Sequence, residues 1–268
     1  METESKRDLI FTIAFDAPNA PFHQMMAKML VSSIFRTGFG GDVLILTNSE
    51  HRVFEHGRAN VEEISLDTSA ISRNELGGEA QQFKYRAREF VAAERYEKVM
   101  FVDCDCLFQR SPDELLNGDE DIRFSEEPVA QLTGEYNNAY LTDAELETLA
   151  GPCINSGVWW VRGDRFAGVM ERWERIDSSP PLRRKLAGDQ PAWARLILDA
   201  QFQSSPFRLG TDIRYPLIER RTEREFAEAV LLHFNAAKPT EKLAQMFGTY
   251  MRRFHAETCF SLLGFLDG

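Results

Sequence analysis

The sequence predicts an α/β fold with a central, largely parallel sheet flanked by helices. Three observations predict it. Short apolar runs recur along the first half of the chain, as at residues 9–15 (LIFTIAF) and 42–47 (DVLILT). A helical apolar pattern separates these two runs at residues 21–37. The run at residues 99–102 (VMFV) is continuously apolar, which is typical of a strand buried on both faces.

The first half of the chain follows the order strand, helix, strand, loop, helix, strand. Gly38 ends the first predicted helix, and a polar segment up to Gly78 follows a weaker strand candidate. This alternation is characteristic of a parallel sheet with crossover helices. The predicted elements are strands at residues 9–15, 42–47 and 61–66, helices at 21–37 and 79–95, and the buried strand that ends at residue 102.

The second half contains two capping-box patterns, at residues 111–114 (SPDE) and 142–145 (TDAE). No repeat or low-complexity linker divides the chain, so we expect one domain over residues 1–240 and a helical extension over residues 241–268. We expect that extension to pack on the domain, although its basic and aromatic residues also suit a membrane surface. The further predicted elements are strands at residues 157–161 and 229–234 and helices at 164–176 and 189–198.

Composition excludes several classes of protein. A formal net charge of -11 over 268 residues argues against a nucleic-acid partner. No apolar stretch approaches the ~20 residues of a transmembrane helix, and the first residues do not resemble a signal peptide. The four cysteines do not suggest a disulfide framework, and we expect Cys104 and Cys106 to be free thiols. The sequence therefore indicates a cytoplasmic protein, in solution or peripheral at a membrane.

Two aspartates follow the buried strand at residues 99–102. Side chains alternate along a strand, so Asp103 and Asp105 point to the same side, where their charges repel each other. A divalent cation would relieve this repulsion most economically, and helix amides or nearby Arg and Lys side chains are the alternatives. His233 ends another predicted strand, and ligands of open α/β sheets bind at the carboxyl ends of strands. Carboxylates with an imidazole suit Mn²⁺ or Mg²⁺ better than a structural zinc site, so we predict that Asp103, Asp105 and His233 bind one of these ions.

Further stretches occur in a fixed order around this motif. Arg86 lies in FKYRAREF ahead of the aspartates, and residues 153–158 read CINSGV. Residues 188–190 read GDQ, and the early SSIFRTGFGGDVLILT joins a helix to a strand. Together these stretches resemble the GT-A type of nucleotide-sugar-dependent glycosyltransferases, most nearly family 8, over roughly residues 8 to 240. The resemblance implies the GT-A fold, with a mixed, mostly parallel sheet flanked by helices.

The resemblance also implies an activity. It is the transfer of a sugar from a nucleoside-diphosphate sugar to an acceptor hydroxyl, with a divalent metal, retention of anomeric configuration and a preference for UDP. It leaves open whether the acceptor is a glycan, a lipid-linked molecule or a protein. By resemblance, the metal ligands are Asp103, Asp105 and His233, the substrate-binding residues are Arg86, Asp103, Asn155, Ser156 and Lys238, and the catalytic residues are Asp189 and Gln190.

The final motif departs from the family pattern H-x-x-G-x-x-K-P-W. Residues 233–240 read HFNAAKPT, which lacks the Gly and the Trp and is one residue shorter before Lys238. One alternative is therefore a non-catalytic GT-A-like protein that binds a nucleotide or glycan. A haloacid dehalogenase-type phosphatase would need an acidic pair after Lys185, where GDQPAW supplies one acid only. A sugar nucleotidyltransferase would need a Gly- and Arg-containing loop where the chain has FDAPNAPFHQ.

Overall fold

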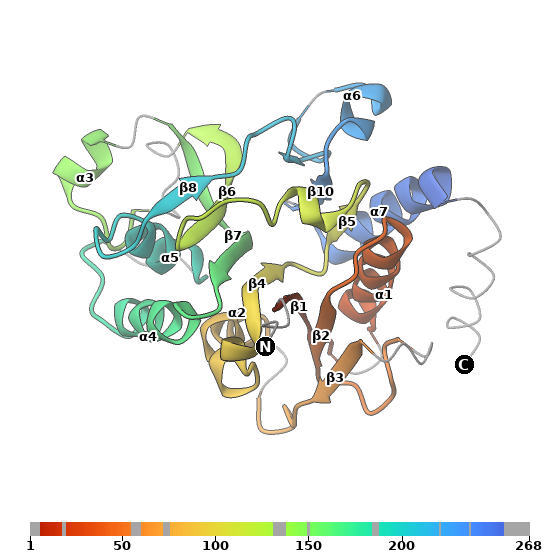
Figure 1. The fold of residues 1–268 in the computed structure, drawn as a ribbon, viewed down its shortest axis with the longest axis horizontal. Coiled ribbons are helices and arrows are strands. Elements are labelled where there is room, and N and C mark those ends of the chain that lie inside the picture. The colour runs from red at the N-terminus through yellow and green to blue at the C-terminus, as the bar shows by residue number, and fades with distance from the viewer. Residues whose placement is uncertain are drawn as a thin grey trace, which may run out of the picture.

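The computed structural model describes residues 6–17, 20–54, 60–71, 76–130, 138–148, 151–183, 188–219, 221–235 and 237–254. A seven-stranded sheet of order β3-β2-β1-β4-β7-β6-β8 forms the centre of the fold (Figure 1). Of these strands only β7 runs antiparallel to its neighbours, which confirms the predicted mixed, mostly parallel sheet. The strands are β1 (Arg7–Ala14), β2 (Asp42–Thr47), β3 (Val61–Ser65), β4 (Tyr96–Val102), β6 (Ile122–Ala130), β7 (Pro152–Arg162) and β8 (Ser204–Pro206).

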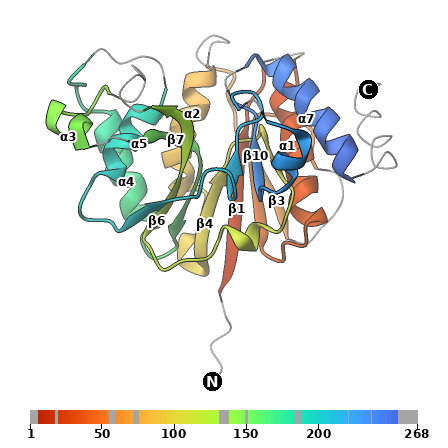
Figure 2. The ribbon, with the colours of Figure 1, turned by 90° about the horizontal axis from the view of Figure 1, so that it is seen from above.

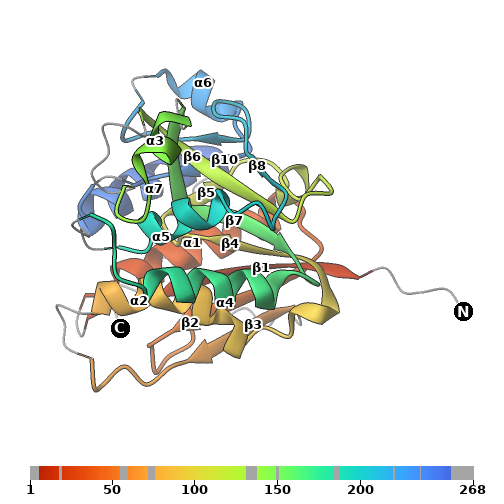
Figure 3. The same ribbon diagram turned by 90° about the vertical axis from the view of Figure 1, so that its left-hand side faces the viewer.

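Helices cover both faces of this sheet, which explains the continuous apolar runs of its central strands. Figure 2 shows α1 and α7 together on one side and α4 and α5 on the other, and Figure 3 shows α2 beside α4. Two short helices, α3 (Asp143–Thr148) and α6 (Glu223–Ala227), lie outside these layers. The covering helices are α1 (Phe22–Arg36), α2 (Leu76–Arg86), α4 (Phe166–Asp177), α5 (Gln190–Ile197) and α7 (Pro239–Phe254).

Two adjacent tryptophans of β7 show how the sheet separates two hydrophobic cores. Trp159 packs with Trp173 and Trp193 of α4 and α5, at ring-centroid distances of 5.8 and 5.2 Å. Trp160 lies in the core that includes α1 and α7, and its indole N–H donates to the Leu115 carbonyl at 2.9 Å. Because neighbouring side chains of a strand face opposite ways, β7 anchors both cores.

A second, three-stranded sheet positions the far end of the chain. It consists of β5 (Cys106–Phe108), β10 (Leu231–His233) and β9 (Ile213–Arg214), in the order β5-β10-β9. The strand predicted at residues 229–234 is therefore shorter than expected and does not belong to the central sheet. It pairs antiparallel with β5, so that His233 lies opposite Cys106. This register carries His233 to the aspartates that precede β5.

Two predicted helical segments differ in detail. The helix predicted at residues 79–95 ends at Arg86, and 3-10 turns at Ala87–Glu89 and Ala93–Arg95 follow it before β4. The amides of Phe90 and Val91 both donate to the Ala87 carbonyl, which tightens the chain into a turn. The box at residues 142–145 does cap α3, whereas Ser111 caps only a 3-10 turn, Pro112–Glu114.

The described part of the chain contains three cysteines, and its helices can be tested as membrane spans. Among them Cys104, Cys106 and Cys153 are buried free thiols, as predicted for the first two. None of the described helices has both the length and the apolar character needed to cross a bilayer.

Helix α7 packs along α1, and a partly buried pair of hydroxyl groups connects the two helices. Tyr250 is fully buried, and its hydroxyl lies 2.6 Å from Ser32 Oγ. We expect Tyr250→Phe to lower the free energy of unfolding by about 1 kcal/mol, because the ring stays packed while one hydrogen bond is lost. Urea unfolding measures this. In the Ser32→Ala background the same change should cost much less, and full additivity of the two losses would contradict the pairing.

A candidate metal and donor site at the end of β4

The chain turns sharply where β4 ends. The Asp103 amide still donates to the Gly157 carbonyl of β7 at 2.7 Å, and the Cys106 amide closes the turn on the Asp103 carbonyl at 3.1 Å. The Phe234 amide then donates to the Asp105 carbonyl at 2.9 Å, which fixes the end of β10 against the same turn. Backbone hydrogen bonds thus hold both aspartates beside His233.

The three predicted metal ligands converge in this turn. His233 Nε2 lies 3.3 Å from Asp105 Oδ1 and 3.7 Å from Asp103 Oδ2. The side chains of His233 and Asp105 are buried, whereas that of Asp103 is 32% exposed. Asp103 therefore marks the open side of the site, and the other two form its buried wall.

Gly157 forms the floor of this site. A Cβ at this position would collide with Asp103 Oδ2 and His233 Cε1, and would lie 2.8 Å from Asn155 Oδ1. The missing side chain lets the β7 backbone approach both candidate ligands. The Gly157 amide donates to Asn155 Oδ1 at 2.7 Å, which holds that side chain at the edge of the same space.

These residues fit a divalent cation. Asp105 Oδ1 is buried and has no hydrogen-bond partner among the described residues, although it lies beside His233. Bonds of about 2.1 Å to one ion would place neighbouring ligand atoms about 3 Å apart, close to the separations found here. Asp105, Cys106 and His233 have candidate ligand atoms all within 4.8 Å of one another, a buried group that does not include Asp103. Burial and both aspartates raise the pKa of Cys106, so the oxygen–imidazole set suits Mn²⁺ or Mg²⁺.

The two aspartates have opposite electrostatic environments. Burial raises the pKa of Asp103, the Lys84 charge opposes this, and the neighbouring Asp105 raises it further. Burial would also raise the pKa of Asp105, but the charges of Lys242 and His233 outweigh it and hold the pKa below its ordinary value. Asp105 is thus the more firmly ionised of the pair.

Lys84 is a site residue that the sequence analysis missed. Its buried ammonium lies 3.3 Å from Asp103 Oδ1 and 3.1 Å from Asp189 Oδ2, and it donates to the Ser156 carbonyl at 3.2 Å. Burial alone would lower the pKa of Lys84, but the two carboxylates raise it above its ordinary value. A permanently charged lysine therefore joins α2, the β4 turn, β7 and the start of α5.

The structure places Arg86 and Lys238 away from the aspartate pair. Arg86 Nε donates to Glu89 Oε1 at 3.1 Å, and the guanidinium lies 4.4 Å from the centre of the Phe83 ring. Lys238 is exposed, immediately before α7. The lysines that contact the aspartates are Lys84 and Lys242. Substrate binding by Arg86 and Lys238 remains a prediction.

A polar network lies on the other side of Asn155. Its Nδ2 donates to Glu127 Oε1 at 2.5 Å and to Gln190 Oε1 at 3.3 Å. Asn235, two residues after His233, donates to the same Glu127 oxygen at 2.9 Å. This network brings Asn155 and Gln190 together, and Lys84 joins Ser156 and Asp189. Glu127 of β6 also belongs to this network, and the sequence did not predict it because no recognisable motif includes it.

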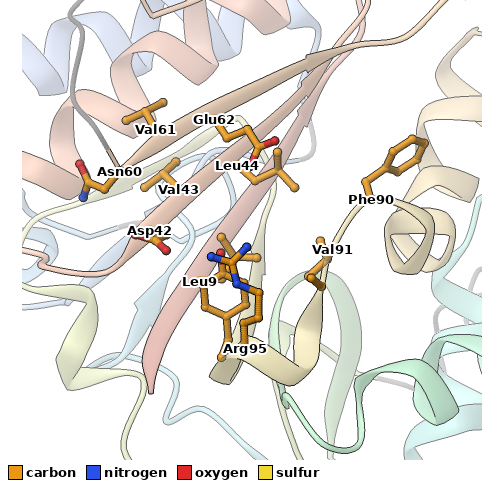
Figure 4. Close-up of a pocket in the computed structure, with 12 residues that line it drawn as sticks. Leu9, Asp42, Val43, Leu44, Asn60, Val61, Glu62, Phe90, Val91 and Arg95 are labelled. Carbon is orange, nitrogen blue, oxygen red and sulfur yellow. The ribbon is translucent and has the colours of Figure 1, made fainter. Parts of the chain in front are cut away.

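A pocket of about 320 Å³ occupies the opposite end of the sheet. It opens beside the first residues of β2, β3 and β4, and Asp42, Asn60 and Arg95 are among its polar lining residues (Figure 4). Asp103 follows the last residue of β4, at the carboxyl ends of the parallel strands. The pocket is therefore separate from the candidate metal site, and the latter is where α/β sheets bind ligands.

Comparison with known proteins gives no match by sequence and clear matches by structure. No protein-family model matches the chain, and no curated protein matches it significantly. The bifunctional glycosyltransferase WbbM, in an apo structure, has a TM-score of 0.60 at 11% identity, over 98% of this chain and 52% of WbbM. The chain thus spans about half of that protein.

Two further structures match over nearly their whole length. The galactosyltransferase LgtC, in complex with donor and acceptor sugar analogues, has a TM-score of 0.56 at 12% identity, over 95% of this chain and 99% of LgtC. Mouse xyloside xylosyltransferase 1, in its apo form, has a TM-score of 0.54 at 11% identity, over 85% and 98%. The chain has the GT-A glycosyltransferase fold, as the sequence predicts.

Proposed function

We propose that this protein is a metal-dependent glycosyltransferase. It would move a sugar from a nucleoside-diphosphate sugar, UDP-sugar first, to an acceptor hydroxyl with retention of configuration. The observation that carries the proposal is the convergence of Asp103, Asp105 and His233 over Gly157. The GT-A fold shared with a galactosyltransferase and a xylosyltransferase supports it.

The reaction joins an acceptor oxygen to the anomeric carbon and breaks the bond from that carbon to the diphosphate. Negative charge develops on the departing diphosphate, and a bound Mn²⁺ or Mg²⁺ supplies the positive charge that stabilises it. Asp103, Asp105 and His233 would hold that ion. Lys84 would hold the Asp103 carboxylate in place through their 3.3 Å contact.

The donor sugar would lie beside the network around Asn155. The side chains of Asn155, Asp189 and Gln190 offer amide donors and oxygen acceptors for its hydroxyl groups, and the Lys84 ion pair fixes Asp189. Glu127 is a half-buried carboxylate held by Asn155 and Asn235. These contacts give the two amides a fixed orientation before a substrate arrives.

A second candidate is a non-catalytic protein of the same fold. The shortened loop at residues 233–240 favours it, because Lys238 is exposed and makes no ion pair with a described residue. The mixed sheet and the GT-A fold argue against the phosphatase alternative. A nucleotidyltransferase shares this fold, and the absence of Gly and Arg from residues 15–24 argues against it.

Metal-dependent nucleotide binding is the first test. A thermal-shift panel of UDP, GDP, CMP and their sugars, with and without Mn²⁺, should single out one nucleotide that stabilises the fold only with metal. A ligand at 100 times its Kd contributes roughly 2.7 kcal/mol to stability. Slow release of free nucleotide from the matching sugar donor then separates an enzyme from a binding protein.

The Asp105→Asn variant tests the metal assignment. We expect it to fold and to lose the Mn²⁺-dependent stabilisation by UDP, because the ionised ligand is replaced by a neutral amide. Asp119→Asn is the control, since Asp119 is exposed and forms no ion pair with any described residue. Stabilisation by UDP and Mn²⁺ that is equal in Asp105→Asn and the natural chain would falsify the assignment.

A further inference from the structure

Lys242 of α7 contacts Asp105, the more buried of the two aspartates that are candidate metal ligands. Its Nζ lies 2.5 Å from Asp105 Oδ2, while Asp105 Oδ1 faces His233 at 3.3 Å. One oxygen of the Asp105 carboxylate thus contacts a lysine, and the other faces the candidate metal site. The Lys242 side chain is 20% exposed, so water reaches it on one side.

The position of Lys242 is fixed by the packing of its helix. Pro239 begins α7 directly after the loop that follows β10, and Met246 and Tyr250 of the same helix are fully buried against the core. Lys242 lies in the first turn, where the chain leaves the candidate site. Its ammonium therefore reaches Asp105 from an anchored backbone, and its long side chain can still redirect the charged end.

A cation at Asp105 Oδ2 weakens the attraction of that carboxylate for a second cation. Two positive charges on one carboxylate repel each other, and the repulsion is stronger in a partly buried site than in water. A nucleoside diphosphate brings negative charge to the same place. It would accept the ammonium as a partner and reduce its repulsion with the ion.

We propose that Lys242 couples metal binding to diphosphate binding in this site. The divalent ion alone must share Asp105 with the ammonium and binds weakly. The diphosphate takes over the ammonium and strengthens the hold of Asp105 on the ion. Metal and nucleotide thus bind cooperatively through one lysine. This inference rests on the proposed function and assigns Lys242 a diphosphate contact that the sequence analysis gave to Lys238.

Coupled binding is a measurable free energy, because each ligand must change the affinity of the other by the same factor. Three values define it for each variant: the Kd of Mn²⁺ alone, the Kd of UDP with a chelator present, and the Kd of Mn²⁺ at saturating UDP. Titration calorimetry, or the electron paramagnetic resonance of free Mn²⁺, gives all three without turnover.

The Lys242→Gln variant should raise the affinity for Mn²⁺ alone and lower the coupling between Mn²⁺ and UDP. We expect Mn²⁺ alone to bind about 3- to 10-fold more tightly, and the UDP-driven gain in Mn²⁺ affinity to fall by about tenfold. Lys242→Arg should keep most of the coupling, because it keeps the charge. Lys6→Gln is the matched control, because Lys6 is exposed directly before β1, and it should leave both Mn²⁺ values unchanged. Lys238→Gln tests the competing diphosphate contact. A thermal unfolding curve verifies that each variant is folded.

The outcomes separate this inference from the proposed function. A natural chain that binds Mn²⁺ and UDP independently of each other overturns both. A natural chain with strong coupling that Lys242→Gln retains overturns the inference alone. Coupling that is lost in Lys238→Gln and kept in Lys242→Gln returns the diphosphate contact to Lys238.

Discussion

A Gly157→Ala protein is expected to keep its fold and to bind Mn²⁺ about 10- to 100-fold more weakly than the natural chain. Removal of a residue that orients a metal ligand typically lowers metal affinity by a similar factor. The added methyl group would overlap Asp103 Oδ2 and the His233 ring, so both candidate ligands must move apart. The overlap is confined to one side of β7, so we expect a stability loss of about 1–3 kcal/mol, typical of overpacking.

Calorimetric titration with Mn²⁺ in saturating UDP checks this result, with unfolding curves to verify the fold. Gly168→Ala is the control, because a Cβ at this exposed position of α4 meets no atom within 4 Å. It should leave Mn²⁺ affinity unchanged and stabilise the helix slightly. Equal Mn²⁺ affinity in the two alanine variants would show that the ion binds elsewhere.

Lys84→Met is expected to lower the free energy of unfolding by about 3–5 kcal/mol, the usual cost of removing one partner of a buried ion pair. Asp189 is 5% exposed and would be left in the protein interior without its partner. The Ser156 carbonyl would lose a donor at the same time. Because Asp103 is one-third exposed, we expect most of the loss to come from Asp189.

Urea unfolding at neutral pH measures the loss. Arg88→Met is a matched control, since Arg88 pairs with the partly exposed Glu174 at 2.6 Å and such pairs contribute about 0.2–1 kcal/mol. Adding Asp189→Asn to Lys84→Met should recover part of the stability, because the unpaired charge is removed. If Lys84→Met costs no more than Arg88→Met, the buried pair does not stabilise the fold.

The sequence predicted the central sheet because its signals are local. β1, β2 and β4 are short apolar runs, whereas β3 carries a weaker pattern. Strand periodicity predicted that Asp103 and Asp105 share one side, but both lie in the turn after β4, and backbone hydrogen bonds of that turn hold them. His233 was found by its position at the end of an apolar run. Its actual strand pairs with β5 in a separate sheet, a long-range pairing that no local pattern specifies.

The contacts of the charged residues around the site could not be predicted from the sequence. Lys84, Arg86 and Arg88 lie within five positions of one another, and only the packing of α2 decides which one faces Asp103. Glu127 reaches Asn155 because of the register between β6 and β7, and Lys242 reaches Asp105 because α7 packs on α1. Each of these contacts depends on tertiary packing, which a single sequence does not encode in a readable pattern.

Lys242 follows Asp105 by 137 residues, so the two contacting residues are synthesised at different times. At ordinary translation rates, roughly 7 to 30 seconds pass between the two residues leaving the ribosomal active centre. In that interval β1, β2 and β4 can assemble, and Lys84 is the only one of the two contacting lysines that the nascent chain already contains. His233 and Lys242 can therefore reach the two aspartates only after β10 and α7 have emerged, when the first strands of the central sheet can already be paired.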